Sequence, residues 1–311
     1  MRKVVYNSSF RNSKFGELEK KFNVVRTHNM DDFKKEIVDA DAIINNHIAI
    51  DSEILDVAKK LKILVQPSDG VDKIDIEECT KRGVAVCNSQ DLYDEVADIA
   101  LFHIINCLRG CTRSNSEMKE GNWYAPYTKN REVKNSNLLV VGYGRIGKQI
   151  ARRASILKMN LYAAKSTHFQ EDDNCHGYTV KAIDLNEGLK IADVVVLALP
   201  LSDSTYHMFN EKTFKMMKDT ASIVNIARGP IIDSEALIDA LKNGDILSAS
   251  LDVYEKEPID KDDEILKMDN LFITAHIGSS TAATRCRMGD DIIDAIIDFF
   301  DGKRPKYQLN L

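Results

Sequence analysis

Short apolar runs alternate with amphipathic segments over roughly the first 90 residues. Runs rich in β-branched residues suit buried strands, whereas apolar residues recurring every three or four positions indicate helices. The predicted strands are Val4–Tyr6, Val24–Arg26, Ala42–Asn45, Ile63–Gln66 and Val84–Cys87. The predicted helices are Lys14–Lys21, Asp32–Val38, Ser52–Lys60 and Ile74–Lys81. Strictly alternating strands and helices predict an α/β fold with a doubly wound parallel sheet.

A second block of the same kind begins at Asn137. It follows a long predicted helix, Asp91–Arg109, and a polar stretch, Arg113–Lys134, which we expect to carry the chain from one domain to the other. After its first strand, the predicted strands are Asn160–Ala164, Asp193–Leu199, Ala221–Ile226, Ser248–Leu251 and Leu271–Thr274. The predicted helices are Lys148–Leu157, Leu185–Ile191, Glu211–Met217, Ser234–Lys242 and Thr281–Phe300.

Two such blocks predict two doubly wound parallel-sheet domains with a cleft between them. We expect the last helix to return the chain to the first block. The first domain is then discontinuous, comprising residues 1–97 and 287–311, and the second comprises residues 98–286. A length of 311 residues fits two domains better than one core.

The composition narrows the possible partners. A formal net charge of −6 argues against nucleic acid. The six cysteines are scattered, and the spacing of Cys107 and Cys111 suits a helix core better than a zinc site, so we expect no metal and a cytoplasmic location. The most hydrophobic predicted helix, Val96–Leu108, is too short to span a bilayer and carries Asp98 and His103, so we expect no membrane partner.

A glycine turn, Gly142-x-Gly144-x-x-Gly147, joins the apolar run Leu138–Val141 to a helix. In this context the first glycine permits the turn, the second lets backbone approach a pyrophosphate, and the third lets helix and strand pack closely. The alternative is a glycine-rich turn without a ligand. The residues predicted to bind a dinucleotide here are Gly142, Tyr143, Gly144, Arg145, Ile146 and Gly147.

Three charged residues, Arg228, Glu257 and His276, each follow a predicted strand of the second block. Each one alone could be a surface or structural residue. Together, beside a nucleotide turn, they suit hydride transfer to a 2-keto acid. An arginine can bind the carboxylate and polarise the carbonyl, and a histidine paired with a carboxylate can stay protonated and donate a proton.

The loop Pro67–Gly70 follows the fourth predicted strand of the first block. Ligands of doubly wound sheets bind beyond the carboxyl ends of strands, so backbone N–H groups of this loop could hold a small anion. An ordinary turn before a helix capped by Asp72 is the alternative.

The whole chain resembles the D-isomer-specific 2-hydroxyacid dehydrogenases, whose fold pairs a flavodoxin-like substrate domain with a Rossmann domain. Besides the glycine turn, the matching segments are Ala40–Asn45, Asp69–Asp75, Arg82–Asn88, Glu95–Leu101, Ala192–Leu201, Asn225–Asp233, Leu251–Pro258 and Ala275–Thr281. Two departures stand out: Ala275 replaces the proline usual before the catalytic histidine, and the loop Asn88–Val96 lacks the usual threonine-proline-glycine.

The resemblance implies roles for single residues. Arg228, Glu257 and His276 become catalytic, with Glu257 preferred to Glu255 because it directly precedes Pro258. The substrate carboxylate would be held by Ser68, Asp69 and Gly70. Asp252 would lie near the nicotinamide, and Leu199-Pro200 would lie near the adenosine ribose. Outside the glycine turn, the resemblance therefore implies cofactor contacts at Leu199, Pro200, Ala227, Asp252 and Gly278.

The choice of nicotinamide cofactor depends on the end of the strand Asn160–Ala164, where an NAD-binding fold usually has an acidic residue. Here Lys165, Ser166, Thr167 and His168 follow instead. These groups would attract a 2′-phosphate, so we predict NADP(H) in preference to NAD(H). A solvated Lys165 is the alternative, and Arg145 could add charge near the phosphates or be surface decoration.

The sequence therefore predicts a reductase of small 2-keto acids such as glyoxylate or hydroxypyruvate, giving the D-2-hydroxy acid. One rival is an NAD-linked D-glycerate or 3-phosphoglycerate dehydrogenase, with His47, Lys73 and Lys129 as candidates for binding a substrate phosphate. Another is a nucleotide-sensing, corepressor-like protein. By resemblance we also expect a homodimer formed through the long helix Asp91–Arg109 and the polar arm after it.

Overall fold

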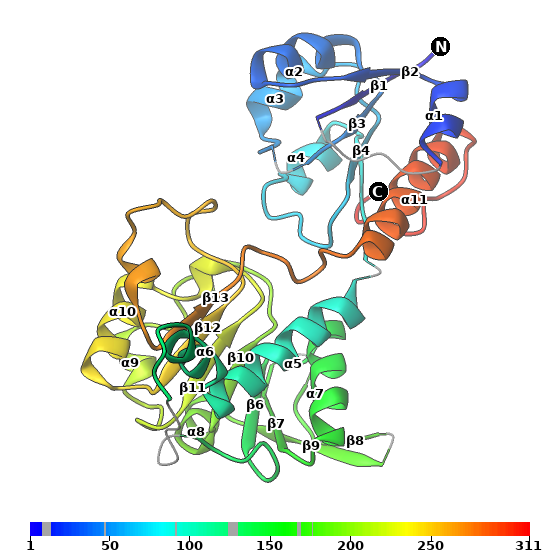
Figure 1. Cartoon of the computed structure of the whole chain (residues 1–311). Coiled ribbons are helices and arrows are strands. Elements are labelled where there is room, and N and C mark those ends of the chain that lie inside the picture. The colour runs from blue at the N-terminus through cyan, green and yellow to red at the C-terminus, as the bar shows by residue number, and fades with distance from the viewer. Residues whose placement is uncertain (8–13, 47, 91, 124–129, 167–168, 176) are drawn as a thin grey trace. The chain divides into compact units, whose positions relative to one another are not determined.

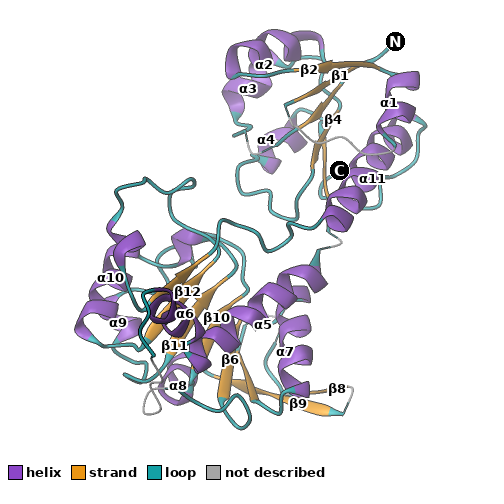
Figure 2. Ribbon diagram, viewed as in Figure 1, coloured by secondary structure: helices purple, strands orange, loops and turns teal. Residues whose placement is uncertain are grey.

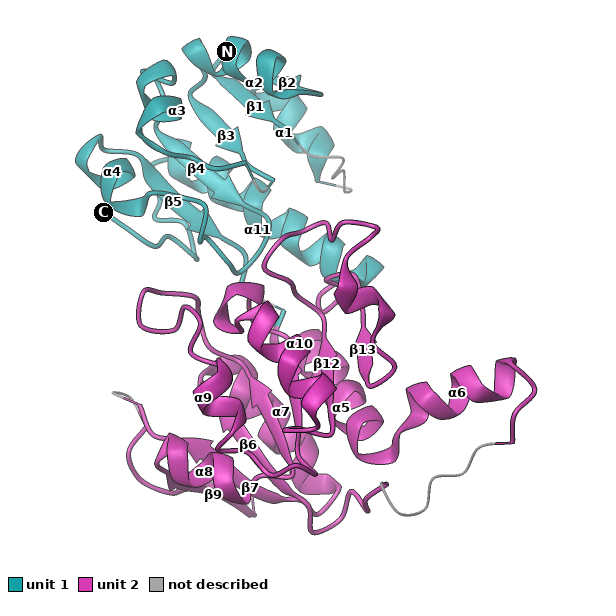
Figure 3. Ribbon diagram, turned by 90° about the vertical axis from the view of Figure 1, so that its left-hand side faces the viewer, with its two compact units in different colours: residues 1–92, 280–311 teal, residues 93–279 magenta. Residues whose placement is uncertain are grey.

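The computed structural model divides the chain into two compact units (Figure 3). Unit 1 comprises Met1–Leu92 and Ser280–Leu311, and unit 2 comprises Tyr93–Ser279. The predicted boundaries at 97/98 and 286/287 fall inside two helices, α5 and α11, whereas the units divide just before each of them. The structure describes residues 1–7, 14–46, 48–90, 92–123, 130–166, 169–175 and 177–311.

Unit 1 is a parallel sheet covered by helices on both faces (Figure 1). Its strands run in the order β2-β1-β3-β4-β5. The strands are β1 Lys3–Tyr6, β2 Asn23–Arg26, β3 Ala42–Ile44, β4 Ile63–Gln66 and β5 Ala85–Asn88. The helices are α1 Phe15–Lys21, α2 Met30–Glu36, η1 Ile37–Asp39, α3 Ser52–Val57, α4 Ile76–Lys81 and α11 Ala282–Phe300.

Strands β3, β4 and β5 are buried along their whole length, which explains their apolar runs, whereas β2 at the sheet edge is partly exposed. One face packs against α1 and α11, where Leu18, Ile293 and Ile296 are fully buried. The other face packs against α2, α3 and α4, represented by Phe33 and Ile54. The last helix therefore supplies part of the core of unit 1.

Unit 2 is a larger sheet with the strand order β13-β12-β11-β10-β6-β7-β9-β8 (Figure 2). Its strands are β6 Asn137–Val141, β7 Asn160–Ala164, β8 Asp173–Cys175, β9 Tyr178–Ile183, β10 Val194–Leu197, β11 Ser222–Asn225, β12 Ser248–Leu251 and β13 Leu271–Ile273. Its helices are α5 Tyr93–Arg109, α6 Cys111–Lys119, α7 Arg145–Ile156, α8 Leu185–Ile191, α9 Glu211–Phe214, η2 Gly229–Ile231, α10 Ser234–Asn243 and η3 Glu264–Lys267.

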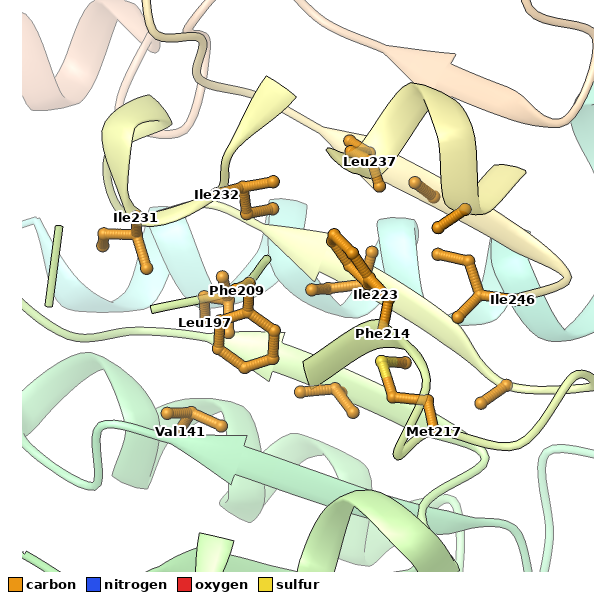
Figure 4. Close-up of a cluster of buried hydrophobic side chains, with 14 of the residues drawn as sticks. Val141, Leu197, Phe209, Phe214, Met217, Ile223, Ile231, Ile232, Leu237 and Ile246 are labelled. Carbon is orange, nitrogen blue, oxygen red and sulfur yellow. The ribbon is translucent and has the colours of Figure 1, made fainter. Parts of the chain in front are cut away.

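Alternate residues of these strands face opposite layers. Ile223 and Leu251 belong to an apolar cluster that also contains Phe214 and Leu237 of α9 and α10 (Figure 4). The opposite face packs against α5, which contacts α7 and strands β10, β11 and β12. The helices on both faces of this largely parallel sheet confirm the predicted doubly wound α/β class.

Three features of unit 2 differ from the sequence predictions. The polar stretch Arg113–Lys134 does not carry the chain between domains, because α5 and α6 both belong to unit 2 and the chain enters it before α5. Helix α6 lies in that stretch and was not predicted because it buries none of its residues, so it shows no apolar face. Strands β8 and β9 were also missed: β8 is short, polar and antiparallel to β9 at the sheet edge.

Candidate active site

The three predicted catalytic residues follow three neighbouring strands. Arg228 follows β11, Glu257 follows β12 and His276 follows β13. These strands pair in parallel, β11 with β12 and β12 with β13, so their carboxyl ends lie at one edge of the sheet. Sheet order therefore brings together segments that are far apart in the sequence.

Glu257 and His276 form a hydrogen-bonded pair. The Nδ1 atom of His276 lies 2.8 Å from Oε2 of Glu257, while the N–H of Tyr254 donates to Oε1 at 3.0 Å. The bond to Glu257 raises the pKa of His276, against burial and the charge of Arg228, which lower it. Burial alone would raise the pKa of Glu257, but the hydrogen bonds from His276 and Tyr254, with the charge of Arg228, bring it below its ordinary value. The pair thus favours a protonated imidazole beside a carboxylate.

Arg228 is held close to this pair by the glycine after it. A Cβ on Gly229 would lie 1.8 Å from the carbonyl carbon of Tyr254, so only glycine lets the two loops approach this closely. The Arg228 side chain also donates from Nη1 to the carbonyl oxygen of Ala227 at 2.6 Å. Sequence reasoning passed over Gly229, although its place directly after Arg228 was visible.

The backbone around His276 is anchored by Asp252, whose side chain is buried. Its Oδ1 accepts the N–H of Ile277 at 2.8 Å and its Oδ2 accepts the N–H of Gly278 at 2.8 Å. His276 itself has a φ of +50°, a conformation that is uncommon for residues other than glycine. Asp252 therefore fixes the turn that presents His276. Its predicted proximity to the nicotinamide stays a prediction.

The glycine turn has the shape that a dinucleotide needs. Gly142 has a φ of +98°, and a Cβ there would lie 2.4 Å from the carbonyl oxygen of Ala198. A Cβ on Gly147 would lie 2.2 Å from the carbonyl oxygen of Gly142, whereas one on Gly144 would meet nothing within 4 Å. Gly142 and Gly147 thus close the turn. Gly144 faces open space at the N-terminus of α7, where a pyrophosphate fits.

The other side chains of the turn point to neighbouring elements. The guanidinium of Arg145 lies 4.7 Å over the ring of Tyr93 and bonds to its hydroxyl, so it is directed toward α5. The ring of Tyr143 packs against Phe169, and its hydroxyl donates to Asp173 of β8 at 3.0 Å. Ile146 follows Arg145 in the first turn of α7.

The remaining predicted cofactor contacts lie near the same edge. A Cβ on Gly142 would lie 2.7 Å from the nitrogen of Leu199, so Leu199-Pro200 after β10 adjoins the glycine turn. Ala227 follows β11 and its N–H donates to Asn225 Oδ1 at 3.0 Å. Lys165 and Ser166 are exposed directly after β7, while Thr167 and His168 lie outside the described residues.

The predicted substrate loop belongs to unit 1 and follows β4. The hydroxyl of Ser68 donates to the carbonyl oxygen of Gly70 at 2.9 Å, and Nδ2 of Asn88 donates to the carbonyl oxygen of Asp69 at 2.7 Å. These bonds shape the loop from within. The following helix, α4, is capped by Asp75, because its first turn begins at Ile76, so the alternative of a helix capped by Asp72 is wrong in that residue.

Among the described residues, no group of three or more His, Cys, Asp or Glu side chains is placed to hold a metal ion. In the same part of the chain, no helix is long and apolar enough to cross a membrane. His47 and Lys129, two of the candidates for phosphate binding, lie outside the described residues, and the third, Lys73, is exposed.

Comparison with known proteins gives one consistent family. Residues 101–278 match the model described as D-isomer specific 2-hydroxyacid dehydrogenase, NAD binding domain. A glyoxylate reductase from Pyrococcus horikoshii is 35% identical over 285 residues, covering 89% of this chain and 84% of that protein. A D-3-phosphoglycerate dehydrogenase from Archaeoglobus fulgidus is 32% identical over 270 residues, covering 86% of this chain and 51% of that protein.

A solved structure extends this similarity to the whole fold. The crystal structure of a glyoxylate reductase from Paecilomyes thermophila is 26% identical, with a TM-score of 0.88 and coverage of 99% of this chain and 98% of that chain. The chain belongs to the D-isomer-specific 2-hydroxyacid dehydrogenase family and is an oxidoreductase that uses a nicotinamide dinucleotide.

Proposed function

We propose that the protein reduces a small 2-keto acid, glyoxylate or hydroxypyruvate, to the D-2-hydroxy acid. The observation that carries the proposal is the Glu257–His276 pair beside Arg228, at the carboxyl edge of a sheet that also carries the glycine turn. Relatives named glyoxylate reductase over most of the chain support this substrate class.

In this proposal His276 is the proton donor. Its Nδ1 is held by Glu257, which leaves Nε2 to donate a proton to the oxygen of the substrate carbonyl. Arg228 binds the substrate carboxylate and stabilises negative charge that develops on that oxygen. When bound, the nicotinamide supplies the hydride to the carbonyl carbon. The loop Ser68–Gly70 is assigned to the substrate carboxylate as well.

We further propose a preference for NADPH over NADH. Lys165 and Ser166 are exposed at the end of β7, where a cation and a hydroxyl can bind a 2′-phosphate. The carboxylate of Asp173 accepts a hydrogen bond from the hydroxyl of Tyr143 in the glycine turn, and this acidic residue was not among those predicted from the sequence. Lys165→Asp should reverse the preference, whereas Lys181→Ala, which removes an exposed lysine from neighbouring β9, should leave it unchanged. An unchanged ratio of kcat/KM values in Lys165→Asp would contradict the assignment.

The test of the main proposal is the initial rate of nicotinamide oxidation with hydroxypyruvate and glyoxylate, each with NADPH and with NADH. Turnover with either acid supports the reductase. An NADH advantage would retain the reductase and overturn the NADPH preference. Binding of NADPH without turnover of a broad panel of keto acids would favour a nucleotide sensor instead.

A second candidate activity, D-glycerate or 3-phosphoglycerate oxidation, is favoured by the similarity to the Archaeoglobus fulgidus enzyme named D-3-phosphoglycerate dehydrogenase. A substrate phosphate needs basic residues, and exposed Lys73 in unit 1 is the described candidate. A kcat/KM for 3-phosphohydroxypyruvate well above that for hydroxypyruvate, lost in Lys73→Ala, would establish this activity over the first.

We also propose a homodimer and a cytoplasmic location. Phe102 of α5, Met118 of α6 and Trp123 after it are 51%, 49% and 89% exposed, so the segment predicted to form the dimer contact presents large apolar side chains to solvent. A partner subunit would cover them. Light scattering at micromolar concentration tests the dimer, and a monomeric mass would refute it.

A further inference from the structure

Helix α5 presents two polar side chains to the sheet of unit 2. His103 and Cys107 lie one helical turn apart, and both are buried. They face the side of the sheet that carries Ser222 of β11 and Ser248 and Ser250 of β12. The apolar cluster lies on the other side of the same strands. A helix that covers a sheet normally uses aliphatic residues at such positions, so the imidazole of His103 requires an explanation.

Both nitrogens of His103 are hydrogen-bonded. Nδ1 lies 2.8 Å from the hydroxyl oxygen of Ser250, and Nε2 lies 3.2 Å from the hydroxyl oxygen of Thr274. The ring also packs edge to face against Phe272 of β13, with 5.3 Å between ring centroids. The imidazole is thus held in one plane by contacts on three sides.

The direction of the hydrogen bonds follows from Thr274. Its hydroxyl lies 2.6 Å from Oδ1 of Asp252, a carboxylate that can only accept, so the single hydroxyl hydrogen goes to Asp252. His103 must then donate from Nε2 to Thr274. Burial lowers the pKa of His103 to about 4, which keeps the imidazole neutral, so Nδ1 carries no hydrogen and accepts from the hydroxyl of Ser250.

The chain of bonds ends at the turn that carries His276. Asp252 receives the hydroxyl of Thr274 on the same oxygen that accepts the N–H of Ile277, and its other oxygen accepts the N–H of Gly278. The N–H of His276 donates to the carbonyl oxygen of Asp252 at 2.9 Å. The orientation of Asp252 therefore determines the orientation of the His276 backbone.

We propose that His103 is a positioning residue for His276: by donating from Nε2 to Thr274 it directs the Thr274 hydroxyl to Asp252, which holds the Ile277–Gly278 backbone. The inference rests on the proposed function, because it assigns His276 to proton donation. It adds a residue of α5 that lies outside the catalytic loops and that contacts neither substrate nor cofactor in this scheme.

Three substitutions of His103 separate positioning from packing. Glutamine can place an amide N–H near the position of Nε2 and so retain the donor to Thr274. Asparagine can reach Ser250 but not Thr274, and leucine provides neither bond. We expect His103→Gln to keep kcat within about threefold of wild type, and His103→Asn and His103→Leu to lower kcat about tenfold with little change in KM for the keto acid.

Cys107→Ala is the matched control. Cys107 lies on the same face of α5, is buried and contacts the same serines, but has no bond to Thr274 or Asp252 among the described residues. It should lower the melting temperature without changing kcat. If His103→Asn and His103→Leu behave like Cys107→Ala, with lower melting temperatures and wild-type kcat, the positioning role is wrong.

A second measurement does not depend on turnover. NMR of ¹⁵N-histidine-labelled protein should show His103 protonated at Nε2 and neutral from pH 5 to 9, and should show a shift in the pKa of His276 in His103→Asn that is absent in His103→Gln. A doubly protonated or Nδ1-protonated His103, or an identical His276 titration in both variants, overturns the inference. If the wild-type protein reduces no keto acid, the proposed function is wrong. The NMR results then still decide whether His103, Thr274 and Asp252 are hydrogen-bonded as proposed.

Discussion

Two histidine–glutamate pairs of unit 2 take their glutamates from one loop, the segment after β12, but they have different surroundings. Glu257 binds Nδ1 of His276 at 2.8 Å, and Glu255, two residues earlier, binds Nε2 of His207 at 2.5 Å. The second oxygen of Glu255 accepts the N–H of Ser234 at the start of α10. His207 also stacks on Tyr206. The Glu255 pair thus ties loops together at the surface.

The Glu257 pair has two further partners in unit 2. Arg228 acts electrostatically on both of its members, and buried Asp252 fixes the backbone after His276. A histidine–carboxylate pair is therefore a weak indicator of catalysis by itself. Its position relative to Arg228, the proposed ligand of the substrate carboxylate, and to the glycine turn carries the functional meaning.

The largest expected difference between the pairs is in turnover. His276→Asn removes the proposed proton donor and should lower kcat for hydroxypyruvate by about 10²- to 10⁴-fold. His207→Asn should change kcat by less than about threefold, since that ring serves only loop contacts. Steady-state kinetics on both variants checks this, and equal losses would abolish the functional distinction between the two pairs.

The next effect concerns the glycine that brings the Arg228 loop to the glutamate loop. Gly229→Ala places a methyl group 1.8 Å from backbone of Tyr254, so one loop must move. We expect a loss of about 1–3 kcal/mol in the free energy of unfolding, together with lower kcat/KM. Gly16→Ala is the control, because a Cβ there meets nothing within 4 Å and lies in helix α1. Urea denaturation that shows equal stability for both variants would contradict the tight contact.

A smaller effect should appear in the pH dependence of reduction. The reaction needs protonated His276, so activity should fall as pH rises through its raised pKa. Glu257→Gln removes the main cause of that increase and should move this alkaline limb of the kcat/KM profile to lower pH. Glu255→Gln should leave the limb in place. A limb that moves equally in both variants would show that general loop damage is responsible.

The smallest expected effect is on stability. Glu257 has a lowered pKa, so its contribution is present above its ordinary pKa of 4.5 and is lost as pH falls. His276 has a raised pKa, so its contribution is present below its ordinary pKa of 6.5 and is lost as pH rises through the folded value. The pair should therefore stabilise the fold most between about pH 4.5 and 6.5.

The magnitude of this contribution should be about 1 kcal/mol or less, since the side chains are 47% and 36% exposed. Comparison of unfolding free energies of wild type and Glu257→Gln at pH 5.5 and pH 9 measures it. A difference between the proteins that is larger at pH 9 would contradict the assigned directions.

Much of the fold could be predicted because its signals are local. The strands Ile63–Gln66, Asn160–Ala164 and Ser248–Leu251 were predicted with the bounds that the structure gives, since each is a short run that follows a clear helical pattern. The hairpin β8–β9 could not be predicted, because an exposed edge strand such as Asp173–Cys175 needs no apolar pattern. Helix α6 escaped detection for the same reason.

The glycine turn and the placement of Arg228, Glu257 and His276 after strands could be predicted from the sequence alone, because these features depend on neighbours along the chain. Which side chains become partners depends on the tertiary structure. Glu255 and Glu257 each acquire a different histidine, and His103 reaches Thr274 from 171 positions away. Such contacts arise from the order of strands in the sheet and the packing of α5 upon it, and no pattern within a single segment encodes them.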